Sequence, residues 1–319
     1  MTHYPTRVLI TGANGWIGSA LYDSLSSDAN TTAIACSRQR TDHSNWRPLP
    51  SLDSTSDKAA FEAVTRDVDV IIHTAARAHH PKETSEHTEH LYDRINHQGT
   101  KLLTQAAQDN GVQTFIFLSS VKAMGEDSGS ATWDENHCPQ PEDAYGRSKY
   151  QAEQTLLALT RQGTMRAHCL RLPLVIGSQP KGNLLRLQRL IQNKIPLPFA
   201  SLKNQRSMLA LPNLISAIQT IIHSNSLNSG IYCLSDTEAV STPELIQALG
   251  LSIQQAPRMY PIHPAILGLA FRCLGRGKDW QRLSGSLVIN NRRFCNTFGW
   301  TPPTTALQCL QAIDAITDQ

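Results

Sequence analysis

Tyr145 and Lys149 are the residues of this chain whose types and spacing best suit chemistry. They lie four apart in Tyr145-Gly-Arg-Ser-Lys149, about twenty-five residues after the pair Ser119-Ser120. If the stretch is helical, residues four apart share a face, so the phenol and the ammonium can point into one cleft. A free tyrosine has a pKa near ~10, and a neighbouring cation favours the phenolate. The spacing therefore predicts a tyrosine tuned for proton transfer.

A glycine-rich loop near the N-terminus predicts a nucleotide site. Gly12, Gly15 and Gly18 follow a strand-like run at 8–11 and open an amphipathic stretch. The first glycine permits a turn, the second lets backbone amides approach a pyrophosphate, and the third lets a helix pack closely on a sheet. The helix N-terminus would then face the phosphates of a dinucleotide.

Strand-length apolar runs alternate with helical patterns in the first half of the chain. The expected strands are 8–11, 31–36, 68–73, 114–118 and 167–172, and the expected helices are 16–26, 57–65, 92–110 and 145–162. This rhythm predicts an α/β fold, with a Rossmann-like, doubly wound parallel sheet over residues 1–172.

Beyond residue 173 the pattern changes to Pro-punctuated loops. Helices are expected at 184–192, 213–223 and 243–249, and a strand at 230–234. These features predict a smaller C-terminal α/β substrate-binding domain at 173–319, with a segment near 208–236 returning to the first domain.

Composition excludes several classes of protein. The chain has 319 residues, 40% of them hydrophobic, and a net charge of +3, which argues against disorder and against a nucleic-acid surface. Seven cysteines without a Cys-x-x-Cys pair indicate neither a disulfide framework nor a zinc ribbon, which favours a cytoplasmic location. The His-rich segment 78–90 lacks metal-ligand spacing, so no metal is predicted.

The longest apolar stretch, 264–274, is too short to span a membrane. It includes Arg272 and falls well below the ~20 residues that a span requires. We expect a buried or interface helix there, with attachment to a membrane surface as the alternative. No transmembrane segment and no signal peptide are predicted.

Short motifs along most of the chain resemble those of extended short-chain dehydrogenase/reductases, and among them the NAD-dependent epimerase/dehydratase family. They are Thr11-Gly-x-x-Gly-x-x-Gly18, His73-Thr-Ala-Ala76, Asn96-x-x-Gly99-Thr100, Leu118-Ser119-Ser120 and Tyr145-x-x-x-Lys149. The resemblance implies that Tyr145 is the general acid or base, that Lys149 holds the cofactor ribose and lowers the tyrosine pKa, and that Ser120 hydrogen-bonds the reacting sugar oxygen. The implied reaction is hydride transfer at a carbonyl carbon.

The same resemblance implies which residues contact the dinucleotide. They are Gly12, Asn14, Gly15, Trp16, Ile17, Gly18, Arg38, Asp53, Ala75, Ala76, Asn96, Tyr145, Lys149 and Pro173. Asn96 would act through structure or water, and Asp53 would contact the adenine, although a helix cap is an alternative role for it.

The end of the second expected strand bears on the choice of cofactor. An acidic residue there would bind a ribose 2′-hydroxyl, but no carboxylate occurs before Asp42. Arg38 stands in its place, and a guanidinium matches a 2′-phosphate. We therefore expect NADP(H), with NAD(H) possible because Arg38 also suits a solvated strand end.

The second half of the chain resembles nucleotide-sugar epimerases and reductases. The resemblance implies that Asn183 and Arg206 contact the diphosphate of a UDP-sugar, and that Ser120, Lys122 and Tyr145 contact its sugar. Val121-Lys122 stands where dehydratases of this superfamily carry an Asp-Glu pair, so 4,6-dehydration is not expected.

With 4,6-dehydration not expected, the resemblance leaves hydride transfer at C4 of the sugar. The sequence segments 120–125 and 282–287 most resemble those of bacterial enzymes that reduce UDP-4-keto-6-deoxy-N-acetylhexosamines, such as UDP-N-acetylquinovosamine dehydrogenases. Such enzymes make precursors of lipopolysaccharide and other surface polysaccharides. A UDP-hexose or UDP-N-acetylhexosamine 4-epimerase is the alternative enzyme, and a non-catalytic NAD(P)-sensing interaction protein is the alternative of another class. The resemblance also implies a homodimer formed through 92–110 and 145–162.

Overall fold

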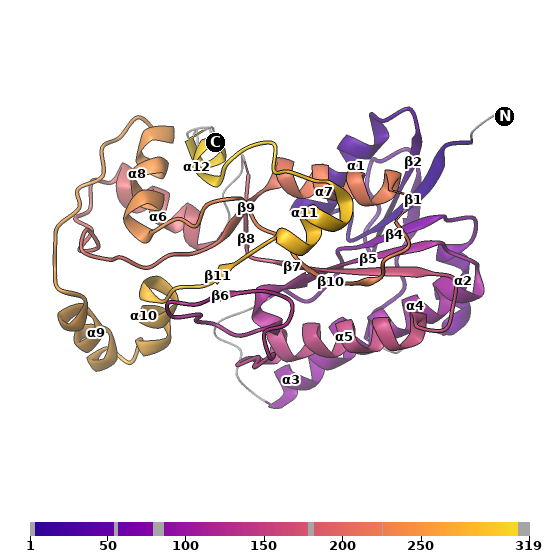
Figure 1. The fold of residues 1–319 in the computed structure, drawn as a ribbon, viewed down its shortest axis with the longest axis horizontal. Helices are drawn as coiled ribbons and strands as arrows, with labels where there is room; N and C mark the ends of the chain where they lie inside the picture. Colours follow the sequence, from indigo (N-terminus) through magenta and orange to yellow (C-terminus); the bar gives the residue numbers. More distant parts are fainter. Residues whose placement is uncertain (1–3, 54–56, 79–85, 178–181, 225, 312–319) are drawn as a thin grey trace.

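A seven-stranded parallel sheet forms the centre of the molecule (Figure 1). The structure is a computed structural model and describes residues 4–53, 57–78, 86–177, 182–224 and 226–311. In spatial order the strands are β10 (Gly230–Cys233), β7 (Arg166–Leu172), β5 (Thr114–Ser120), β4 (Val70–His73), β1 (Thr6–Thr11), β2 (Thr31–Ser37) and β3 (Trp46–Pro48).

Side chains of the central strands are buried on both faces of the sheet. Val8 and Ile10 pack into one hydrophobic cluster, whereas Leu9 packs into the other. This alternation is the period of two of an extended strand, and burial on both sides explains why the strands read as continuous apolar runs.

Helices cover both faces (Figure 1). One face carries α1 (Trp16–Ser26), α7 (Leu211–His223) and α11 (Arg292–Phe298), and the other carries α2 (Lys58–Thr65), α4 (Gly99–Asp109) and α5 (Ala144–Thr160). The doubly wound, Rossmann-like arrangement predicted from the sequence is confirmed.

The helix expected over 92–110 consists of three segments. They are α3 (Glu86–Tyr92), a π-helical segment (Asp93–Gln98) and α4. Asn96 lies in the π-helical segment and is 1% exposed. Such wide turns often mark functional positions.

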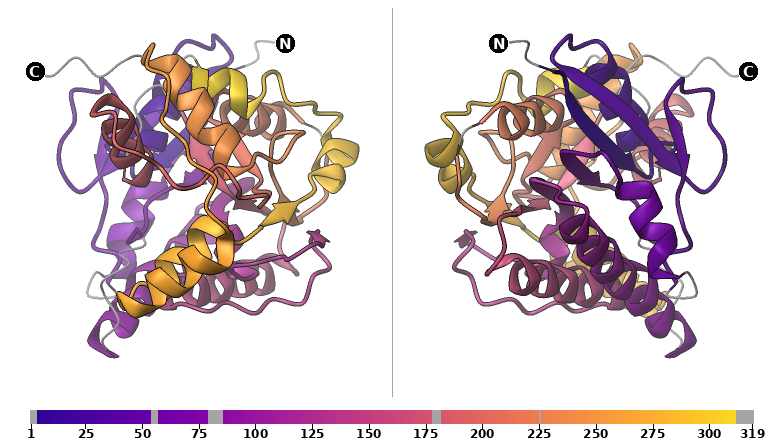
Figure 2. Two further views of the ribbon diagram at one scale, coloured as in Figure 1. Left: turned by 90° about the vertical axis from the view of Figure 1, so that its left-hand side faces the viewer. Right: turned by 90° about the vertical axis from the view of Figure 1, so that its right-hand side faces the viewer.

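The second half of the chain builds a smaller α/β layer at one end of the sheet, which the left panel of Figure 2 views face on. Its own hydrophobic cluster includes residues such as Ile176, Leu184 and Ile246. The elements are β8 (Leu174–Ile176), α6 (Asn183–Gln192), β9 (Met208–Ala210), α8 (Thr242–Ser252), α9 (Pro264–Cys273), α10 (Gly277–Ser284) and α12 (Ala306–Gln311).

Two short strands tie the halves together. β6 (Thr132–Trp133) pairs in parallel with β11 (Val288–Ile289), and the carboxylate of Glu135 accepts a hydrogen bond of 2.7 Å from the backbone amide of Cys233. The division at residues 172 and 173 stays a prediction. Within the described ranges, no helix is both long and apolar enough to cross a membrane.

Candidate active site

A cleft of about 680 Å³ opens at the carboxyl ends of the central strands. The strand order reverses direction between β1 and β4, the point where open α/β sheets bind ligands. Of the residues singled out from the sequence, the cleft brings together Gly12, Asn14, Gly15, Trp16, Ile17, Gly18, Arg38, Asp53, Ala75, Ala76, Ser120, Tyr145, Lys149 and Pro173.

The glycine loop packs so closely that side chains are excluded at Gly12 and Gly18. A Cβ on Gly18 would lie 2.2 Å from the carbonyl oxygen of Gly12, and a Cβ on Gly12 would lie 2.7 Å from the hydroxyl of Thr74. The first turn of α1 holds no acidic residue, so the amides at its N-terminus meet no competing carboxylate from that turn. The cradle therefore fits a dinucleotide diphosphate.

Gly12→Ala is expected to weaken dinucleotide binding by more than about tenfold, because the new methyl group would contact Thr74 and Ala75 at the floor of the cleft. Gly111→Ala is the matched control. Both glycines have a φ of 72°, but a Cβ on Gly111 meets nothing within 4 Å. Each variant should lose about 1 kcal/mol of stability from its backbone strain. Isothermal titration with NADH and NADPH separates the two, and equal affinities in both variants would contradict the assignment of this loop.

Tyr145 lies in the first turn of α5 and points into the cleft. The carboxylate of Asp143 caps this helix by accepting the amide hydrogen of Gly146 at 2.7 Å. The Tyr145 phenol shares a hydrogen bond with Ser120, and its ring meets the buried Tyr92 edge-on at 6.1 Å. These contacts fix the direction of the phenol oxygen.

The pKa of the Tyr145 phenol is raised to about 12, chiefly by burial. The hydrogen bond with Ser120 lowers this pKa, and the charge of Asp143 raises it. The resemblance implied that Lys149 lowers the pKa of Tyr145. In this structure the effect of burial, which disfavours the phenolate, is larger than that of the contacts that stabilise the phenolate. A phenol with this pKa is protonated at neutral pH, and the raised pKa makes it a weaker acid than a free tyrosine.

Lys149 lies one turn further along α5 and is 2% exposed. Its ammonium donates to the carbonyl oxygen of Leu118 at 2.8 Å and lies 4.5 Å from the ring centre of Phe117. Burial lowers the pKa of Lys149 to about 8, against the opposing charge of Glu153. The backbone carbonyl thus fixes the ammonium beside the cleft.

Asn96 and Lys122 do not line the cleft. Asn96 lies beneath it, where its amide accepts the backbone hydrogen of Arg77 at 2.8 Å and donates to the hydroxyl of Ser148 at 3.0 Å. This agrees with a supporting role. The ammonium of Lys122 pairs with Asp143 at 2.8 Å and with Glu126, so reaching a sugar would require it to leave these carboxylates.

Asn183 and Arg206 lie in the second half of the chain, outside the cleft. Asn183 is the exposed first residue of α6. The guanidinium of Arg206 donates to the carbonyl oxygens of Gly285 at 2.9 Å and Arg282 at 3.2 Å. Burial lowers the pKa of Arg206. The structure thus does not bring these two residues together with Tyr145.

Asp53 lines the cleft and is not the cap of the following helix. Asp57 holds that position, where its carboxylate accepts the amide of Ala59. The carboxylate of Asp53 accepts instead from the hydroxyl of Ser51 at 2.8 Å, and its carbonyl accepts from Arg94. The helix-cap alternative for Asp53 is therefore wrong.

His73 packs beneath the cleft with both ring nitrogens hydrogen-bonded. Nδ1 lies 2.7 Å from the hydroxyl of Thr11, Nε2 lies 3.0 Å from that of Thr100, and the ring stacks on Phe117. Burial, helped by the charge of Lys149, lowers its pKa to about 3. Within the described residues no group of three or more His, Cys, Asp or Glu could hold a metal ion; residues 79–85 of the His-rich segment lie outside them.

His73 predicts a loss of stability in mild acid. In the unfolded chain, residue 73 is protonated below the ordinary histidine pKa, whereas in the folded protein it stays neutral down to about pH 3. The free energy of unfolding therefore falls as the pH falls through this window. From pH 7 to pH 4 the contribution should be on the order of 3 kcal/mol. Urea unfolding across this range should show a shallower pH dependence for His73→Gln than for wild type, and exposed His90→Gln should match wild type; a His73→Gln profile equal to wild type would contradict the account.

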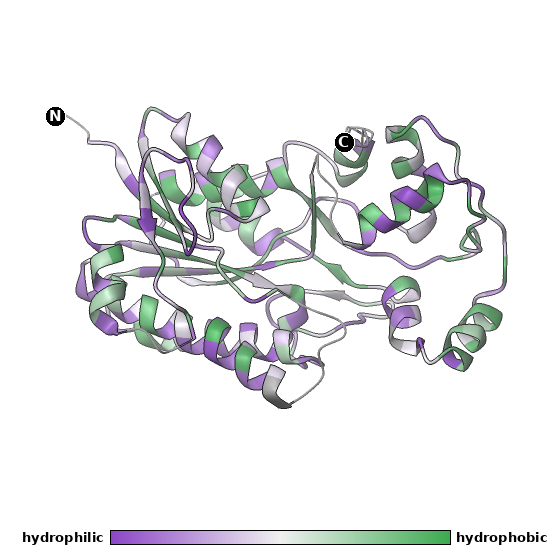
Figure 3. Ribbon diagram, turned by 180° about the vertical axis from the view of Figure 1, so that it is seen from behind, coloured by the Kyte–Doolittle hydropathy of each residue, from purple (hydrophilic) through white to green (hydrophobic). Residues whose placement is uncertain are grey.

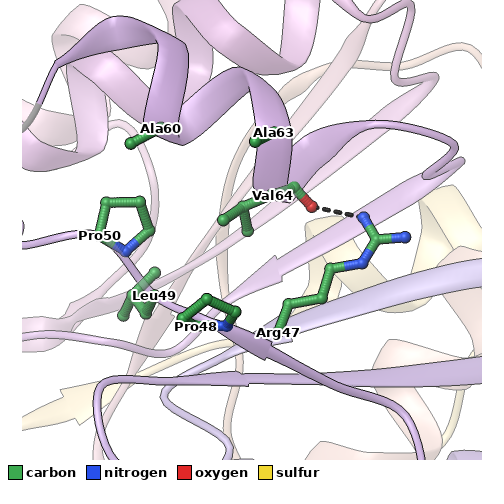
Figure 4. Close-up of a pocket in the computed structure, with 7 residues that line it drawn as sticks. All are labelled: Arg47, Pro48, Leu49, Pro50, Ala60, Ala63 and Val64. Carbon is green, nitrogen blue, oxygen red and sulfur yellow. Dashed lines mark hydrogen bonds between the residues drawn. The ribbon is translucent and has the colours of Figure 1, made fainter.

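A second hollow, of about 370 Å³, lies between β3 and α2 (Figure 4). In this hollow the guanidinium of Arg47 donates to the carbonyl oxygen of Val64 at 2.6 Å. The other lining residues are Pro48, Leu49, Pro50, Ala60 and Ala63. This lining offers no acid, base or nucleophile, so the chemistry belongs to the main cleft.

Sequence reasoning missed a buried ion pair below the active site. Arg171 and Glu153 are 1% and 0% exposed and meet at 2.7 Å, and Glu153 also accepts a hydrogen bond from the hydroxyl of Ser119. The helical spacing could have indicated Glu153, because it follows Lys149 by four residues and therefore lies on the same helix face as Tyr145 and Lys149.

This fold and cleft define a dinucleotide-binding enzyme of the Rossmann class. Residues 8–232 match the model of the NAD dependent epimerase/dehydratase family, and the chain belongs to that family. It is 31% identical over 305 residues to a UDP-glucose 4-epimerase of Vibrio cholerae, covering 94% of this chain and 92% of the relative.

A second relative is an N-acetyl-alpha-D-glucosaminyl-diphospho-ditrans,octacis-undecaprenol 4-epimerase of Escherichia coli O157:H7, 26% identical over 91% of this chain and 86% of the relative. Among solved structures, MoeE5 in complex with UDP-glucuronic acid and NAD aligns over 96% of this chain and 97% of its own with a TM-score of 0.76 and 20% identity. The UDP-glucose 4-epimerase of Thermotoga maritima, solved with UDP-glucose, aligns over the same shares with a TM-score of 0.76 and 17% identity. At such identity the structures support the fold alone.

Proposed function

We propose that this enzyme transfers a hydride at C4 of a UDP-sugar, and that its main reaction is reduction of a UDP-4-keto-6-deoxy-N-acetylhexosamine to the alcohol, a step that would supply lipopolysaccharide or another surface polysaccharide. The observation that carries this proposal is the hydrogen bond between Tyr145 and Ser120 in the cleft that also contains the glycine loop. It brings a proton donor and a hydroxyl to one point beside the expected dinucleotide.

Each residue of the cleft has a distinct task in this reaction. The dinucleotide, held by Gly12, Gly15 and Gly18, supplies or takes up the hydride when bound. Tyr145 gives its phenolic proton to the oxygen at C4, or accepts the hydroxyl proton in the reverse direction. Ser120 donates a hydrogen bond to the same oxygen, and Lys149 stabilises negative charge on the phenol oxygen and binds a ribose hydroxyl.

The diphosphate of the substrate needs hydrogen-bond donors, at least one of them cationic. We assign it to Arg206 and Asn183, because a planar guanidinium forms paired hydrogen bonds with phosphate oxygens. Arg206 already has its guanidinium held by the carbonyls of Gly285 and Arg282, which restricts its direction. Lys122 would contact the sugar after exchanging a carboxylate partner.

Arg38 governs the choice between the two coenzymes in this proposal. Its exposed side chain lines the cleft at the end of β2, where a ribose 2′-phosphate would lie. We therefore assign NADP(H) as the preferred coenzyme, with NAD(H) as the alternative that the NAD-bound structures of similar fold favour.

Arg38→Ser is expected to lower the affinity for NADPH by about tenfold or more while changing the affinity for NADH little, because one charge-assisted phosphate contact is lost. Arg40→Ser is the matched control, since Arg40 is also exposed but does not line the cleft. Fluorescence titration with both coenzymes measures the ratio. An unchanged ratio in Arg38→Ser would contradict the assignment to NADP(H).

UDP-sugar 4-epimerisation is the second candidate, favoured by the names of two relatives. An epimerase retains its coenzyme and lets a 4-keto intermediate turn over, whereas a reductase exchanges its coenzyme in every cycle. The exposed Arg38 favours reduction, because it suits a phosphorylated coenzyme that is exchanged in every cycle.

Two incubations separate the candidates. With UDP-4-keto-6-deoxy-N-acetylglucosamine and NADPH, stoichiometric coenzyme oxidation with formation of a C4 alcohol supports the reductase. Interconversion of UDP-N-acetylglucosamine and UDP-N-acetylgalactosamine without added coenzyme supports the epimerase. If no reaction occurs in either assay, nor with UDP-glucose and UDP-galactose in the second, the proposal of chemistry at C4 is wrong.

The proposed assembly is a homodimer in the cytoplasm, formed through α4, α5 and the π-helical segment between α3 and α4. These elements pack side by side on one face of the sheet, which would provide a continuous helical surface. Light scattering after size exclusion measures the mass directly, and a monomer at micromolar concentration would contradict this assembly.

A further inference from the structure

Helix α9 is apolar along its length except for Arg272 in its last turn. Leu267 and Gly268 are buried, and Gly268 allows close contact because a Cβ there would lie 2.9 Å from the indole nitrogen of Trp280 on α10. Ile266 and Leu269, on another side of the helix, are 63% and 64% exposed. A helix of this composition is normally buried or in contact with a membrane.

The exposed residues form one continuous face. Ile266, Leu269, Ala270 and Cys273 follow the spacing i, i+3, i+4 and i+7 of a helix, and all four are exposed. Leu274, which caps the helix, is 72% exposed. The sequence predicted a buried or interface helix here, and the structure leaves this face open; Figure 3 shows the largely apolar helix at the end of the molecule away from the N-terminus.

Basic residues outnumber acidic residues around this face. Residues 245–278 include Arg258, Arg272, Arg276 and Lys278 but no aspartate or glutamate, although the whole chain holds 26 acidic residues in 319. Arg258, Arg272 and Arg276 are exposed, and Arg276 pairs with Asp279 just beyond the segment. An apolar face bordered by cations complements a surface of anionic lipid headgroups.

The size of this face argues against a protein partner. Its three large exposed side chains offer a few hundred Å², less than the about 800 Å² that each partner of a stable complex buries. A lipid surface requires no matching partner shape. At 10 residues, α9 is also too short to span a bilayer, so it would lie in the plane of the interface.

We propose that α9 docks the protein on an anionic phospholipid surface, with Ile266, Leu269 and Leu274 entering the boundary between headgroups and acyl chains, and with Arg272 contacting lipid phosphates. This inference goes beyond the proposed reaction and does not depend on it. Docking would confine the enzyme to a membrane surface without anchoring it permanently.

Co-sedimentation of the full chain with vesicles tests the proposal. The protein should pellet with mixed phosphatidylglycerol and phosphatidylcholine vesicles and much less with phosphatidylcholine alone, and salt should weaken the binding. Ile266→Ser combined with Leu269→Ser should lower the partition coefficient by about tenfold or more. Arg272→Gln should lower it by about fivefold.

Leu227→Ser is the matched control, because Leu227 is 80% exposed but lies outside α9. It should bind vesicles like wild type, and thermal unfolding should show that all variants fold. The proposal is overturned if wild type does not distinguish the two kinds of vesicle, or if the double α9 variant binds as wild type does. It is also overturned if the wild-type protein does not bind vesicles and light scattering shows a dimer for wild type but a monomer for the double variant. The α9 face would then contact a second copy of the chain.

Discussion

Tyr145→Phe is expected to lower kcat by about 10²–10⁴-fold while leaving dinucleotide affinity unchanged. The substitution removes the only proton that the phenol can give, but it keeps the ring that packs edge-on against Tyr92. It also removes one partner of the Ser120 hydroxyl, which still accepts the amide hydrogen of Lys122 at 3.2 Å and cannot replace an acid in the cleft. Steady-state kinetics on the 4-keto substrate and a coenzyme titration measure the two quantities.

Tyr150→Phe provides the matched control on the same helix. Tyr150 is partly exposed and does not line the cleft, so its variant should turn over at the wild-type rate. Full activity of the Tyr145→Phe variant would show that the phenol is not the proton donor. Equal losses in both variants would indicate damage to α5 instead of loss of a proton donor.

Glu153→Gln is expected to destabilise the fold by about 3–5 kcal/mol, because it leaves the charge of Arg171 buried without a carboxylate. Arg171 and Glu153 are almost fully buried and meet through two guanidinium nitrogens, at 2.7 Å and 3.1 Å. Nη1 of Arg171 has no hydrogen-bond partner among the residues that the structure describes, so Glu153 is its main compensation. Urea unfolding at neutral pH measures the loss.

The exposed pair of Glu89 and Arg147 supplies the comparison. Its side chains are 54% and 41% exposed, so Glu89→Gln should cost less than about 1 kcal/mol. A similar unfolding midpoint for the two variants would mean that the buried pair contributes no more than a surface contact. Glu153 also accepts a hydrogen bond from the hydroxyl of Ser119, next to Ser120, so the buried pair adjoins the active site.

The sheet and the cleft were predictable because local patterns specify them. Runs such as 8–11 and 114–118 are apolar on both faces, as strands covered by helices on both sides must be. Gly12 and Gly18 permit backbone contacts that no other residue allows, so their spacing indicates the turn directly. Tyr145 and Lys149 line the same cleft because residues four apart share a helix face.

Contacts between distant segments were not predictable in the same way. β6 and β11 have two residues each, too few to display an alternating pattern, yet they join the two halves. Arg206 is held by the carbonyl oxygens of Arg282 and Gly285, which are remote in sequence. Neither arrangement leaves a local signal, because it depends on how separate elements pack.

The most direct test of the proposed reaction follows the hydrogen that is transferred. The wild-type enzyme would be given UDP-4-keto-6-deoxy-N-acetylglucosamine and reduced coenzyme deuterated on both hydrogens at the nicotinamide C4, and the product would be examined by proton NMR and mass spectrometry. We predict one deuterium, bound at C4 of the sugar, for each coenzyme oxidised. Absence of coenzyme oxidation, or deuterium at any other carbon of the sugar, would contradict the account.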